Sequence, residues 1–173
     1  NRWSGKDTLR MSDFDKLVYM SRLIGSDPSL VVWGGGNTSI KVTEKDFDGK
    51  DIDVLRIKGS GSDMKSVEHR HFPRLRLHDV LPLFHYESMS DDQMVAYLDH
   101  CVVDIGSPRP SIETLLHAFL PFKAVVHSHA DAIVALTNNQ DAETLLTNVF
   151  GSDVTVVEYI RPGFKLSKLV GRK

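Results

Sequence analysis

Apolar residues near the start of the chain recur at helical spacing and predict an amphipathic helix over residues 12–25. The apolar face of that helix consists of Phe14, Leu17, Val18, Leu23 and Ile24. Ser12 is a residue type that caps helix N-termini, whereas Gly25 and Pro28 are types that end helices. We therefore expect the folded core to begin with a helix.

Shorter runs of continuous or alternating hydrophobicity follow and predict a set of strands. These runs cover residues 30–33, 38–42, 54–57, 75–78, 124–129 and 154–159. Helices are predicted over residues 79–84, 91–103, 111–120 and 131–137, with a further helical start after Pro162-Gly163. Because successive strands are joined by short turns and helices lie before and after them, the pattern predicts a mainly antiparallel sheet covered on both faces.

The composition is that of one soluble globular domain, with 173 residues of which 41% are hydrophobic and 25% are charged. The formal net charge is -2 and the basic residues are scattered, so we expect neither nucleic acid nor a membrane as partner. Cys101 is the only cysteine, which excludes an internal disulfide and favours a cytoplasmic location. No apolar run approaches the roughly 20 residues that cross a bilayer, and the polar start does not resemble a signal peptide.

A histidine pair, His127-Ser128-His129, is the first candidate for chemistry. Side chains at i and i+2 of a strand point to the same face, so both imidazoles could bind one ion such as zinc. The same spacing is common on solvated strand faces, so the pair alone leaves both interpretations open. His69 and His71 have this spacing too, but they lie in a charged, irregular stretch and are interpreted as surface residues.

Glu113 is the second candidate, because it follows the rigid Ser107–Pro110 loop at the start of the predicted helix 111–120, which Ser111 would cap. A carboxylate there is favoured by the helix dipole, which is a sufficient structural explanation. The functional alternative is that Glu113 is a general base. The helix start could lie near one end of the histidine strand, where the carboxylate could abstract a proton beside a carbonyl.

Two turns of small residues, Gly34–Ser39 and Gly59–Ser62, form the third candidate. Successive N–H groups in such turns can bind an anion, although each turn taken alone is more commonly a plain hairpin connection. Neither turn has the spacing of a dinucleotide-binding fingerprint or opens a helix in a parallel unit, so nothing indicates nicotinamide binding.

Taken together, these segments resemble the class II aldolase and adducin head family. The resemblance is carried by GGGNTSIK at 34–41, KGSGSDM at 58–64, RPSIETLLHAFLP at 109–121, VVHSHADAIVALTN at 125–138 and YIRPGFKLSKLV at 159–170. Within the family the chain looks closest to the aldolase part of bifunctional rhamnulose-1-phosphate aldolase/alcohol (short-chain) dehydrogenases. The resemblance implies a three-layer α/β/α fold with a zinc site at the edge of its sheet.

The resemblance also implies roles for individual residues. His127 and His129 would be zinc ligands and Glu113 the catalytic acid/base. The substrate phosphate would be bound by Gly36, Asn37, Ser60, Gly61 and Ser111. Where the family often has a second serine, this chain has Ile112. The family's third zinc histidine follows the Pro-Gly segment, and no histidine follows His129 here. We therefore expect residues 1–173 to be one C-terminally truncated domain, with the third ligand beyond Lys173.

The activity that this resemblance implies is zinc-dependent cleavage of a ketose 1-phosphate, similar to rhamnulose 1-phosphate. The products would be dihydroxyacetone phosphate and a short aldehyde such as lactaldehyde. The alternatives are a non-catalytic adducin-like head, and another metal-dependent enzyme of the same fold, such as a sugar-phosphate epimerase, a dehydratase or a decarboxylating relative. The family also implies a homo-oligomer, a tetramer, and the parent protein could carry a separate short-chain dehydrogenase domain.

Overall fold

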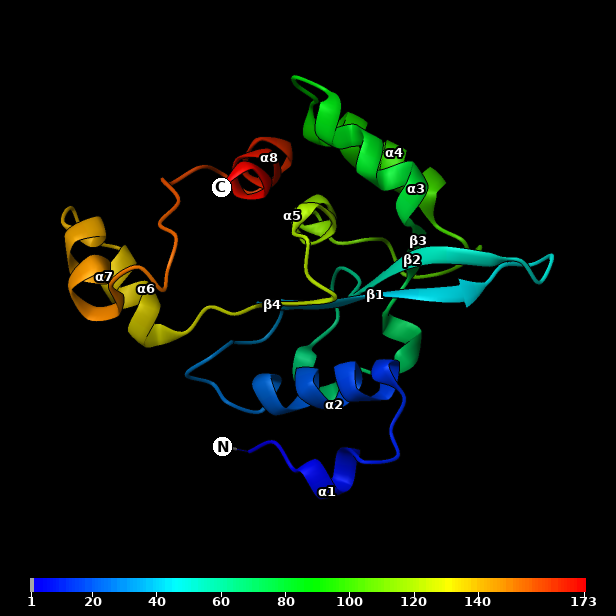
Figure 1. Cartoon of the computed structure of the whole chain (residues 1–173), viewed down its shortest axis with the longest axis horizontal. Helices are drawn as coiled ribbons and strands as arrows, with labels where there is room; N and C mark the ends of the chain where they lie inside the picture. Colours follow the sequence, from blue (N-terminus) through cyan, green and yellow to red (C-terminus); the bar gives the residue numbers. More distant parts are fainter. Residues whose placement is uncertain (1) are drawn as a thin grey trace.

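The computed structural model describes residues 2–173 and has a four-stranded antiparallel sheet at its centre (Figure 1). The spatial order of the strands is β3-β2-β1-β4. Their bounds are Asn37–Lys45 for β1, Asp51–Ile57 for β2, Arg74–Arg76 for β3 and Ala124–His127 for β4. The predicted antiparallel sheet is thus confirmed.

The register of the sheet brings three strand ends together. β1 pairs with β2 on one side, with Ser39 opposite Ile57, and with β4 on the other side, with Asn37 opposite His127. The first residues of β1 therefore lie beside the last residues of β2 and β4. Any side chains that leave these three ends can meet at one edge of the sheet.

Helices cover both faces of the sheet, as predicted (Figure 1). On one face α2 (Asp13–Gly25) packs its apolar side against the sheet, and its N-terminus is closed by a capping box between Ser12 and Asp15. The other face carries α3 (Leu77–Val80), α4 (Asp91–Cys101), α5 (Thr114–Phe119) and α8 (Phe164–Arg172). A short helix, α1 (Gly5–Thr8), precedes α2, and 3-10 turns occupy Met64–Ser66, His69–His71 and Leu81–His85.

The core on the α5 side is the larger of the two. Its fully buried side chains come from β2, α3, α4, α5 and α8, including Leu55, Ile57, Leu98, Leu115 and Phe164. The smaller core under α2 contains Leu17, Val18, Ile40, Val67 and Phe72. These two cores fix α5 and the strand ends relative to one another, which is what positions the site.

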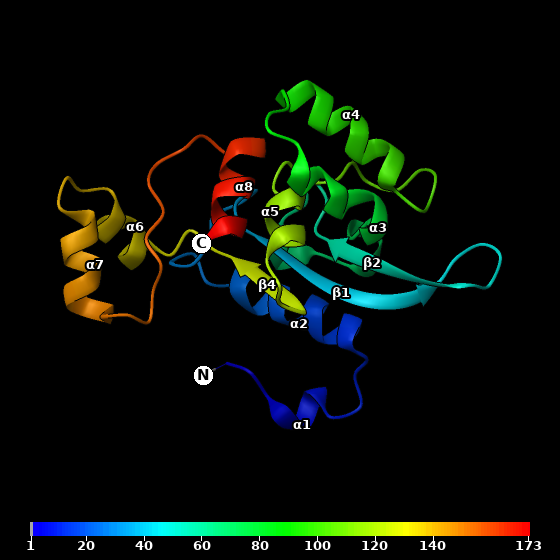
Figure 2. The same ribbon diagram turned by 45° about the horizontal axis from the view of Figure 1, so that its top comes forward.

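Two helices stand to the side of this body, α6 (Asp131–Thr137) and α7 (Ala142–Phe150) (Figures 1 and 2). α6 has no buried residue and α7 has one, Leu146. Helix α7 was not predicted from the sequence. Its first turn has no side-chain cap, so the local signal for a helix start is weak.

Two predicted strands are wrong, because neither residues 30–33 nor residues 154–159 form regular structure. Both runs are apolar, yet Val32, Trp33 and Tyr159 are largely exposed. A strand needs a neighbour with which to exchange backbone hydrogen bonds, and neither run has one in the sheet of residues 2–173. Apolar composition alone therefore misled the prediction.

Other boundaries need smaller corrections. β3 is shorter than the predicted strand 75–78, because the chain turns into α3 at Leu77. α4 ends at Cys101 rather than at Val103, and β4 ends at His127 rather than at His129.

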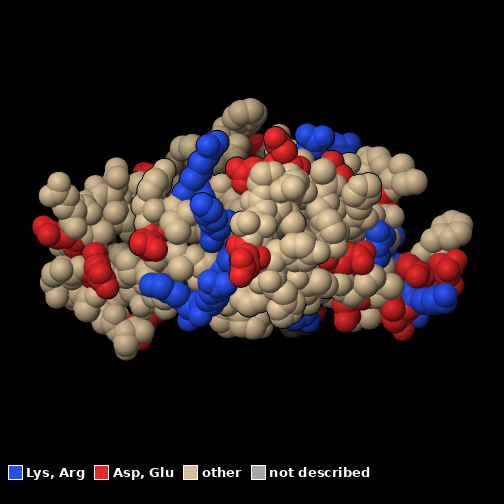
Figure 3. All heavy atoms as spheres, turned by 90° about the horizontal axis from the view of Figure 1, so that it is seen from above, with Lys and Arg blue, Asp and Glu red and all other residues tan. Residues whose placement is uncertain are grey.

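None of the helices in residues 2–173 has the length and apolar character that a bilayer crossing requires. Figure 3 looks onto the side that carries α4 and α8. Basic side chains form a short row there, with acidic side chains on either side of it, so the charge on this face is mixed.

Candidate active site

The site lies at the edge where β1 begins and β2 and β4 end. Asn37 opens β1 directly opposite His127, and the N–H of Lys58, just after β2, donates to the carbonyl of Thr38. The loop before α5 closes the same region, because the N–H of Ser60 donates to the carbonyl of Arg109. Segments that are far apart in the sequence therefore meet here.

Glu113 is held by two side chains from the strand ends. Its Oε1 lies 3.0 Å from Nδ1 of His127, and its Oε2 accepts a hydrogen bond of 3.4 Å from Nδ2 of Asn37. Burial acts to raise the pKa of this carboxyl, but the hydrogen bond and charge of His127 outweigh it, so the pKa is lowered from its ordinary value. Glu113 is consequently ionised at neutral pH and has a fixed orientation.

The helix start around Glu113 differs from the prediction. Ser111 does not cap a helix over 111–120; α5 begins at Thr114, and Glu113 occupies the position just before it. The hydroxyl of Ser111 instead accepts a hydrogen bond of 3.2 Å from the N–H of Glu113, while its carbonyl accepts from the N–H of Thr114. The buried Ser111 thus shapes the turn that presents Glu113.

The two predicted histidine ligands lie beside each other, with ring centroids 4.8 Å apart. His127 is the last residue of β4, whereas His129 lies beyond the strand, where its N–H donates to the carbonyl of Leu30. Because Nδ1 of His127 faces Glu113, Nε2 is the nitrogen left to bind a metal. The imidazole of His129 faces Gly35, where an added Cβ would lie 3.1 Å from its Nδ1.

A third histidine, His117, was missed by the sequence analysis. It is fully buried, and its Nδ1 lies 2.7 Å from the hydroxyl of Ser39. Among residues 2–173, Nε2 of His117 is the one buried side-chain nitrogen or oxygen atom that has no hydrogen-bond partner. Burial lowers the pKa of His117 to about 4, so the ring is neutral. The signal in the sequence was its i+4 spacing from Glu113, which places both on one face around a helix start.

Glu113, His117 and His127 form a group that fits a divalent cation. Each offers one ligand atom, and these atoms all lie within 4.8 Å of one another. Two imidazoles and a carboxylate are a donor set that suits zinc and related metals. The orphaned Nε2 of His117 supports the same conclusion, because a buried polar atom without a partner is rare in native proteins. His129 lies outside this group but next to His127.

The first glycine turn has a conformation that requires glycine. Gly36 has a φ of 68°, and an added Cβ would lie 2.6 Å from Cγ1 of Val31 and 2.9 Å from the carbonyl oxygen of His127. Gly34 also has a positive φ, 78°, but open space surrounds it. Asn37 follows at 1% exposure, and its side chain joins the turn to Glu113.

The second turn packs against the loop that leads to Glu113. An added Cβ on Gly59 would lie 2.9 Å from Cβ of Pro108, so the two backbones approach closely. Ser60 and Gly61 are exposed at the tip, and Gly61 has a φ of 77°. Gly36, Asn37, Ser60, Gly61 and Ser111 therefore lie on segments that surround Glu113. Their contact with a phosphate stays a prediction.

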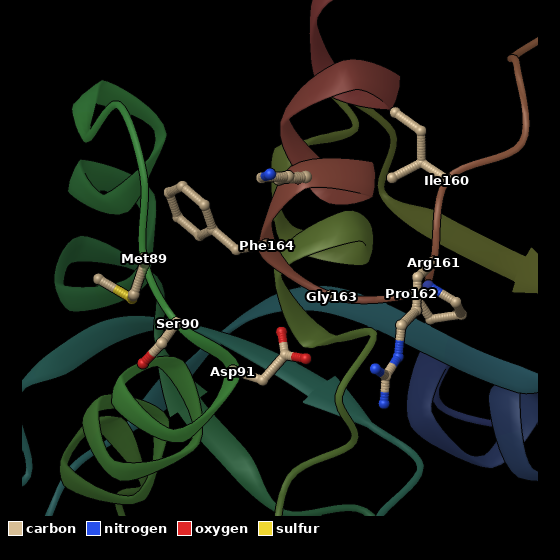
Figure 4. A pocket seen from close by; sticks show the side chains of 9 residues that line it. Met89, Ser90, Asp91, Ile160, Arg161, Pro162, Gly163 and Phe164 are labelled. Atoms are coloured by element: carbon tan, nitrogen blue, oxygen red, sulfur yellow. The ribbon is translucent and has the colours of Figure 1, made fainter.

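A cavity of about 330 Å³ lies elsewhere, between the starts of α4 and α8 (Figure 4). It contains none of the residues predicted for the site. Asp91 points towards Gly163 there, and an added Cβ on Gly163 would lie 2.5 Å from the Oδ1 of Asp91. The contact explains why glycine precedes α8.

His69 is exposed, as predicted, whereas His71 is half-buried. Nε2 of His69 lies 2.7 Å from Oδ1 of Asp15, and Nδ1 of His71 accepts from the N–H of Glu68. Their nitrogens thus have partners away from the strand ends.

A three-layer domain with an antiparallel sheet and a carboxylate–imidazole group at the sheet edge defines an α/β protein of the class II aldolase type. The chain belongs to the Class II Aldolase and Adducin N-terminal domain family, whose model matches residues 15–172. This agrees with the resemblance carried by the glycine turns, the Glu113 loop and the histidine pair.

Individual relatives agree with this assignment. The chain is 49% identical over 156 residues to a Bacillus subtilis protein named "Uncharacterized oxidoreductase YuxG"; the match covers 90% of this chain and 23% of that protein. A solved N-terminal class II aldolase domain of a conserved protein from Thermoplasma acidophilum is 48% identical, with a TM-score of 0.92. The match covers 99% of this chain and 79% of the Thermoplasma acidophilum chain. The Escherichia coli protein YgbL, described as a putative aldolase/epimerase/decarboxylase, shares the fold with a TM-score of 0.56 and 19% sequence identity. That match covers 90% of this chain and 66% of the YgbL chain.

Proposed function

We propose that this chain is the catalytic domain of a metal-dependent aldolase that cleaves a ketose 1-phosphate. The substrate class is similar to rhamnulose 1-phosphate, and the products are dihydroxyacetone phosphate and a short aldehyde. The observation that carries the proposal is the ionised Glu113, fixed by His127 at 3.0 Å and by Asn37 at the edge where both glycine turns lie. A base, imidazole ligands and an anion-binding surface are the three parts that this reaction needs.

Glu113 performs the proton transfers in this proposal. In retro-aldol cleavage, the hydroxyl on the carbon that becomes the aldehyde loses its proton, and the carbon released from the broken bond gains one. Glu113 accepts the first proton and supplies the second, so the carboxylate is restored at the end of the cycle. Its two side-chain partners hold it in one orientation between these steps.

Zinc is the proposed metal, and the imidazoles of His127, His129 and His117 would be its donors, which leaves Glu113 as the acid/base. A bound divalent metal supplies Lewis-acid polarisation of the substrate carbonyl. The turns at Gly36 and Gly61 bind the phosphate, and this remote binding orients the reacting carbons beside Glu113.

The test is product analysis on the intact protein, loaded with zinc and supplied with a panel of ketose 1-phosphates. We expect dihydroxyacetone phosphate and an aldehyde to appear together in equal amounts. An epimerised sugar phosphate, a dehydrated product or released carbon dioxide would instead assign one of the alternative reactions. Binding of metal without any turnover of the panel would favour the adducin-like alternative.

Glu113→Gln provides the matched variant, because it keeps the size and one hydrogen-bonding oxygen. Loss of a general acid/base should lower turnover by roughly 10²- to 10⁴-fold. The zinc content should stay nearly intact, measured by elemental analysis. Unchanged turnover would remove Glu113 from the acid/base role, whereas loss of zinc would assign it to the metal.

The Bacillus subtilis relative is named an oxidoreductase, but the glycine turns of this chain do not have the arrangement that binds a nicotinamide cofactor. Neither glycine turn opens a helix in a parallel unit, because Gly36 leads into β1 and Gly61 follows β2. The chain spans about a quarter of that relative's length. We therefore assign any such activity to other parts of a longer protein.

A further inference from the structure

A buried pair of hydroxyl groups joins α2 to the first residues of β1. Oγ of Ser21 and Oγ1 of Thr38 lie 2.6 Å apart, and both residues are 0% exposed. Because Ser21 donates its hydroxyl proton to the carbonyl of Leu17, at 2.6 Å, Thr38 is the donor in the bond between the two hydroxyls. The start of β1 is therefore bonded to one particular residue of the helix that covers this face of the sheet.

Stability alone does not call for this polar pair. The core under α2, in which it lies, is otherwise apolar and contains Leu17, Val18 and Ile40. Replacing both partners of a buried hydrogen bond by apolar groups of the same shape is often nearly neutral for the free energy of unfolding. An apolar pair would lack a preferred direction, whereas a hydrogen bond has one. The hydroxyl pair thus fixes the orientation of Thr38 more narrowly than packing would.

Thr38 is also bonded to the side chain of the residue before it. Its N–H donates to Oδ1 of Asn37 at 2.8 Å. Because the oxygen of the amide is bonded in this way, Nδ2 is the end of the Asn37 side chain that faces Glu113, where it donates to Oε2 at 3.4 Å. The backbone of Thr38 therefore determines which end of the amide meets the carboxylate.

These bonds form a continuous path from α2 on one face of the sheet to the start of α5 on the other. The path runs from Ser21 through Thr38 and Asn37 to Glu113. Asn37 is 1% exposed, and both ends of its amide have partners within the chain. The bond from Asn37 to Glu113 is long, so a small movement of β1 is enough to break it.

We propose that Thr38 is a positioning residue for Glu113, which it serves by holding the amide of Asn37 in the orientation that donates to the carboxylate. Ser21 in α2 is the anchor of this arrangement. The inference rests on the proposed function, since it adds a supporting residue to the same site. It predicts that a hydroxyl pair under α2 affects turnover although neither residue contacts the substrate.

Steady-state kinetics of the intact, zinc-loaded protein test this role, with the sugar phosphate that the product panel identifies. Thr38→Val removes the hydroxyl and keeps the shape of the side chain. It should lower kcat by about 10-fold, because a small displacement of a catalytic group is costly. The KM should stay within about twofold of the wild-type value, because Thr38 does not bind the substrate. Thr38→Ser keeps the hydroxyl and should have a higher kcat than the Val variant.

A double-mutant cycle tests whether Thr38 acts through Asn37. Asn37→Ala removes the amide, so adding Thr38→Val to it should lower kcat no further. Losses that multiply in the double variant would overturn the proposed path.

Ser21→Ala and Ser167→Ala are a matched pair of variants. Both serines are buried in a helix and donate to the carbonyl four residues earlier, but Ser167 lies in α8 and is bonded to Gly163. Ser21→Ala should lower kcat as Thr38→Val does, whereas Ser167→Ala should leave kcat unchanged. Equal kcat values in these two variants would contradict the anchoring role of Ser21.

A second measurement does not depend on turnover. The side-chain NH2 group of Asn37 gives an NMR signal, which Asn37→Ala identifies by its loss. Its hydrogens should exchange slowly with solvent in the wild type, because the group is buried and bonded to Glu113, and about 10-fold faster in the Thr38→Val protein. Unchanged exchange would overturn the proposal. If Thr38→Val does not fold, Ser21→Ala provides the same two comparisons without a change in β1.

The outcomes separate this inference from the proposed function. Amide exchange and kcat that both depend on Thr38, in a protein whose products are those of an epimerase or a dehydratase, would support the Thr38 role and contradict the aldolase assignment. Aldol cleavage with an equal kcat in the Thr38→Val and wild-type proteins would do the reverse. Faster exchange without any loss of kcat would also overturn the role of Thr38, because the orientation of Asn37 would then not matter for turnover.

Discussion

The hydroxyl of Ser39 and Nδ1 of His117 lie 2.7 Å apart in the core and join β1 to α5. Both residues are buried, at 1% and 0% exposure. The pair fixes the ring of His117 next to the residue that precedes its helix, Glu113, and so connects the core of the domain to its site. Among residues 2–173 the other ring nitrogen has no hydrogen-bond partner, so within this part of the chain Ser39 is the one hydrogen-bonding anchor of the imidazole.

Ser39→Ala should therefore destabilise the domain. It leaves a second nitrogen of a buried ring unsatisfied, which typically costs about 1–3 kcal/mol. Urea denaturation followed by circular dichroism would measure the free energy of unfolding. Thr43→Ala on the same strand is the control, since its bond to Asp53 is exposed and should contribute under about 1 kcal/mol. Equal effects of the two substitutions would contradict the anchoring role of Ser39.

The stability of the metal-free domain should fall as the pH is lowered from 6.5 towards 4. The pKa of His117 is about 4 when folded, against an ordinary value of 6.5, so the unfolded chain binds the extra proton in this range. The free energy of unfolding therefore decreases with falling pH, by roughly 1.5 kcal/mol between pH 6.5 and 5 from this residue alone.

Unfolding in urea at a series of pH values would measure this dependence. The slope should be smaller in His117→Asn, which has no group that titrates there. An identical slope in the His117→Asn protein would show that the ring is not buried in its neutral form.

Removal of either imidazole of the predicted pair should release the metal. His127→Ala and His129→Ala should each lower zinc affinity by roughly 10-fold or more, because loss of even an outer-shell partner costs about 10- to 100-fold. Zinc titration with a competing chelator would measure the affinities. His71→Ala provides the matched control, since His69 and His71 share the spacing but have partners elsewhere. Retention of zinc by the His129→Ala protein would leave Glu113, His117 and His127 as the ligand group.

Gly36→Ala should destabilise the domain more than Gly34→Ala. Both glycines have positive φ, which costs a substituted residue roughly 1–3 kcal/mol. The Cβ at Gly36 would in addition meet Val31 and the carbonyl of His127 at under 3 Å, whereas nothing lies within 4 Å at Gly34. Thermal or urea unfolding would compare the two variants. Similar losses would mean that the backbone near Gly36 can relax, and that close packing does not fix this turn.

The parts of the fold that could be predicted from the sequence are those with a local physical cause. The helix after Ser12 has an apolar face and a capping box, and β1 and β2 are joined by a short hairpin turn. The false strand at 154–159 has strand-like composition, but composition cannot reveal whether a neighbouring strand is present.

The site was predicted unevenly for a similar reason. Glu113 and the histidine pair stood out by their spacing, and the family resemblance supplied the roles that spacing could not. His117 did not stand out, because burial and a ring nitrogen without a partner become visible only when distant segments are packed together. The place of this ring depends on Ser39 in β1.

β1 spans the sheet from the site at Asn37 to the hairpin at Asp46–Lys50, and its nine residues are about 30 Å long. The hairpin tip is exposed, with Phe47 fully accessible to solvent. A fluorescent reporter attached at Asp48 would therefore sit in the turn at the end of β1 that lies opposite the candidate metal group. This separation makes the tip a suitable attachment point from which energy-transfer distances to labelled ligands could be measured without touching the site.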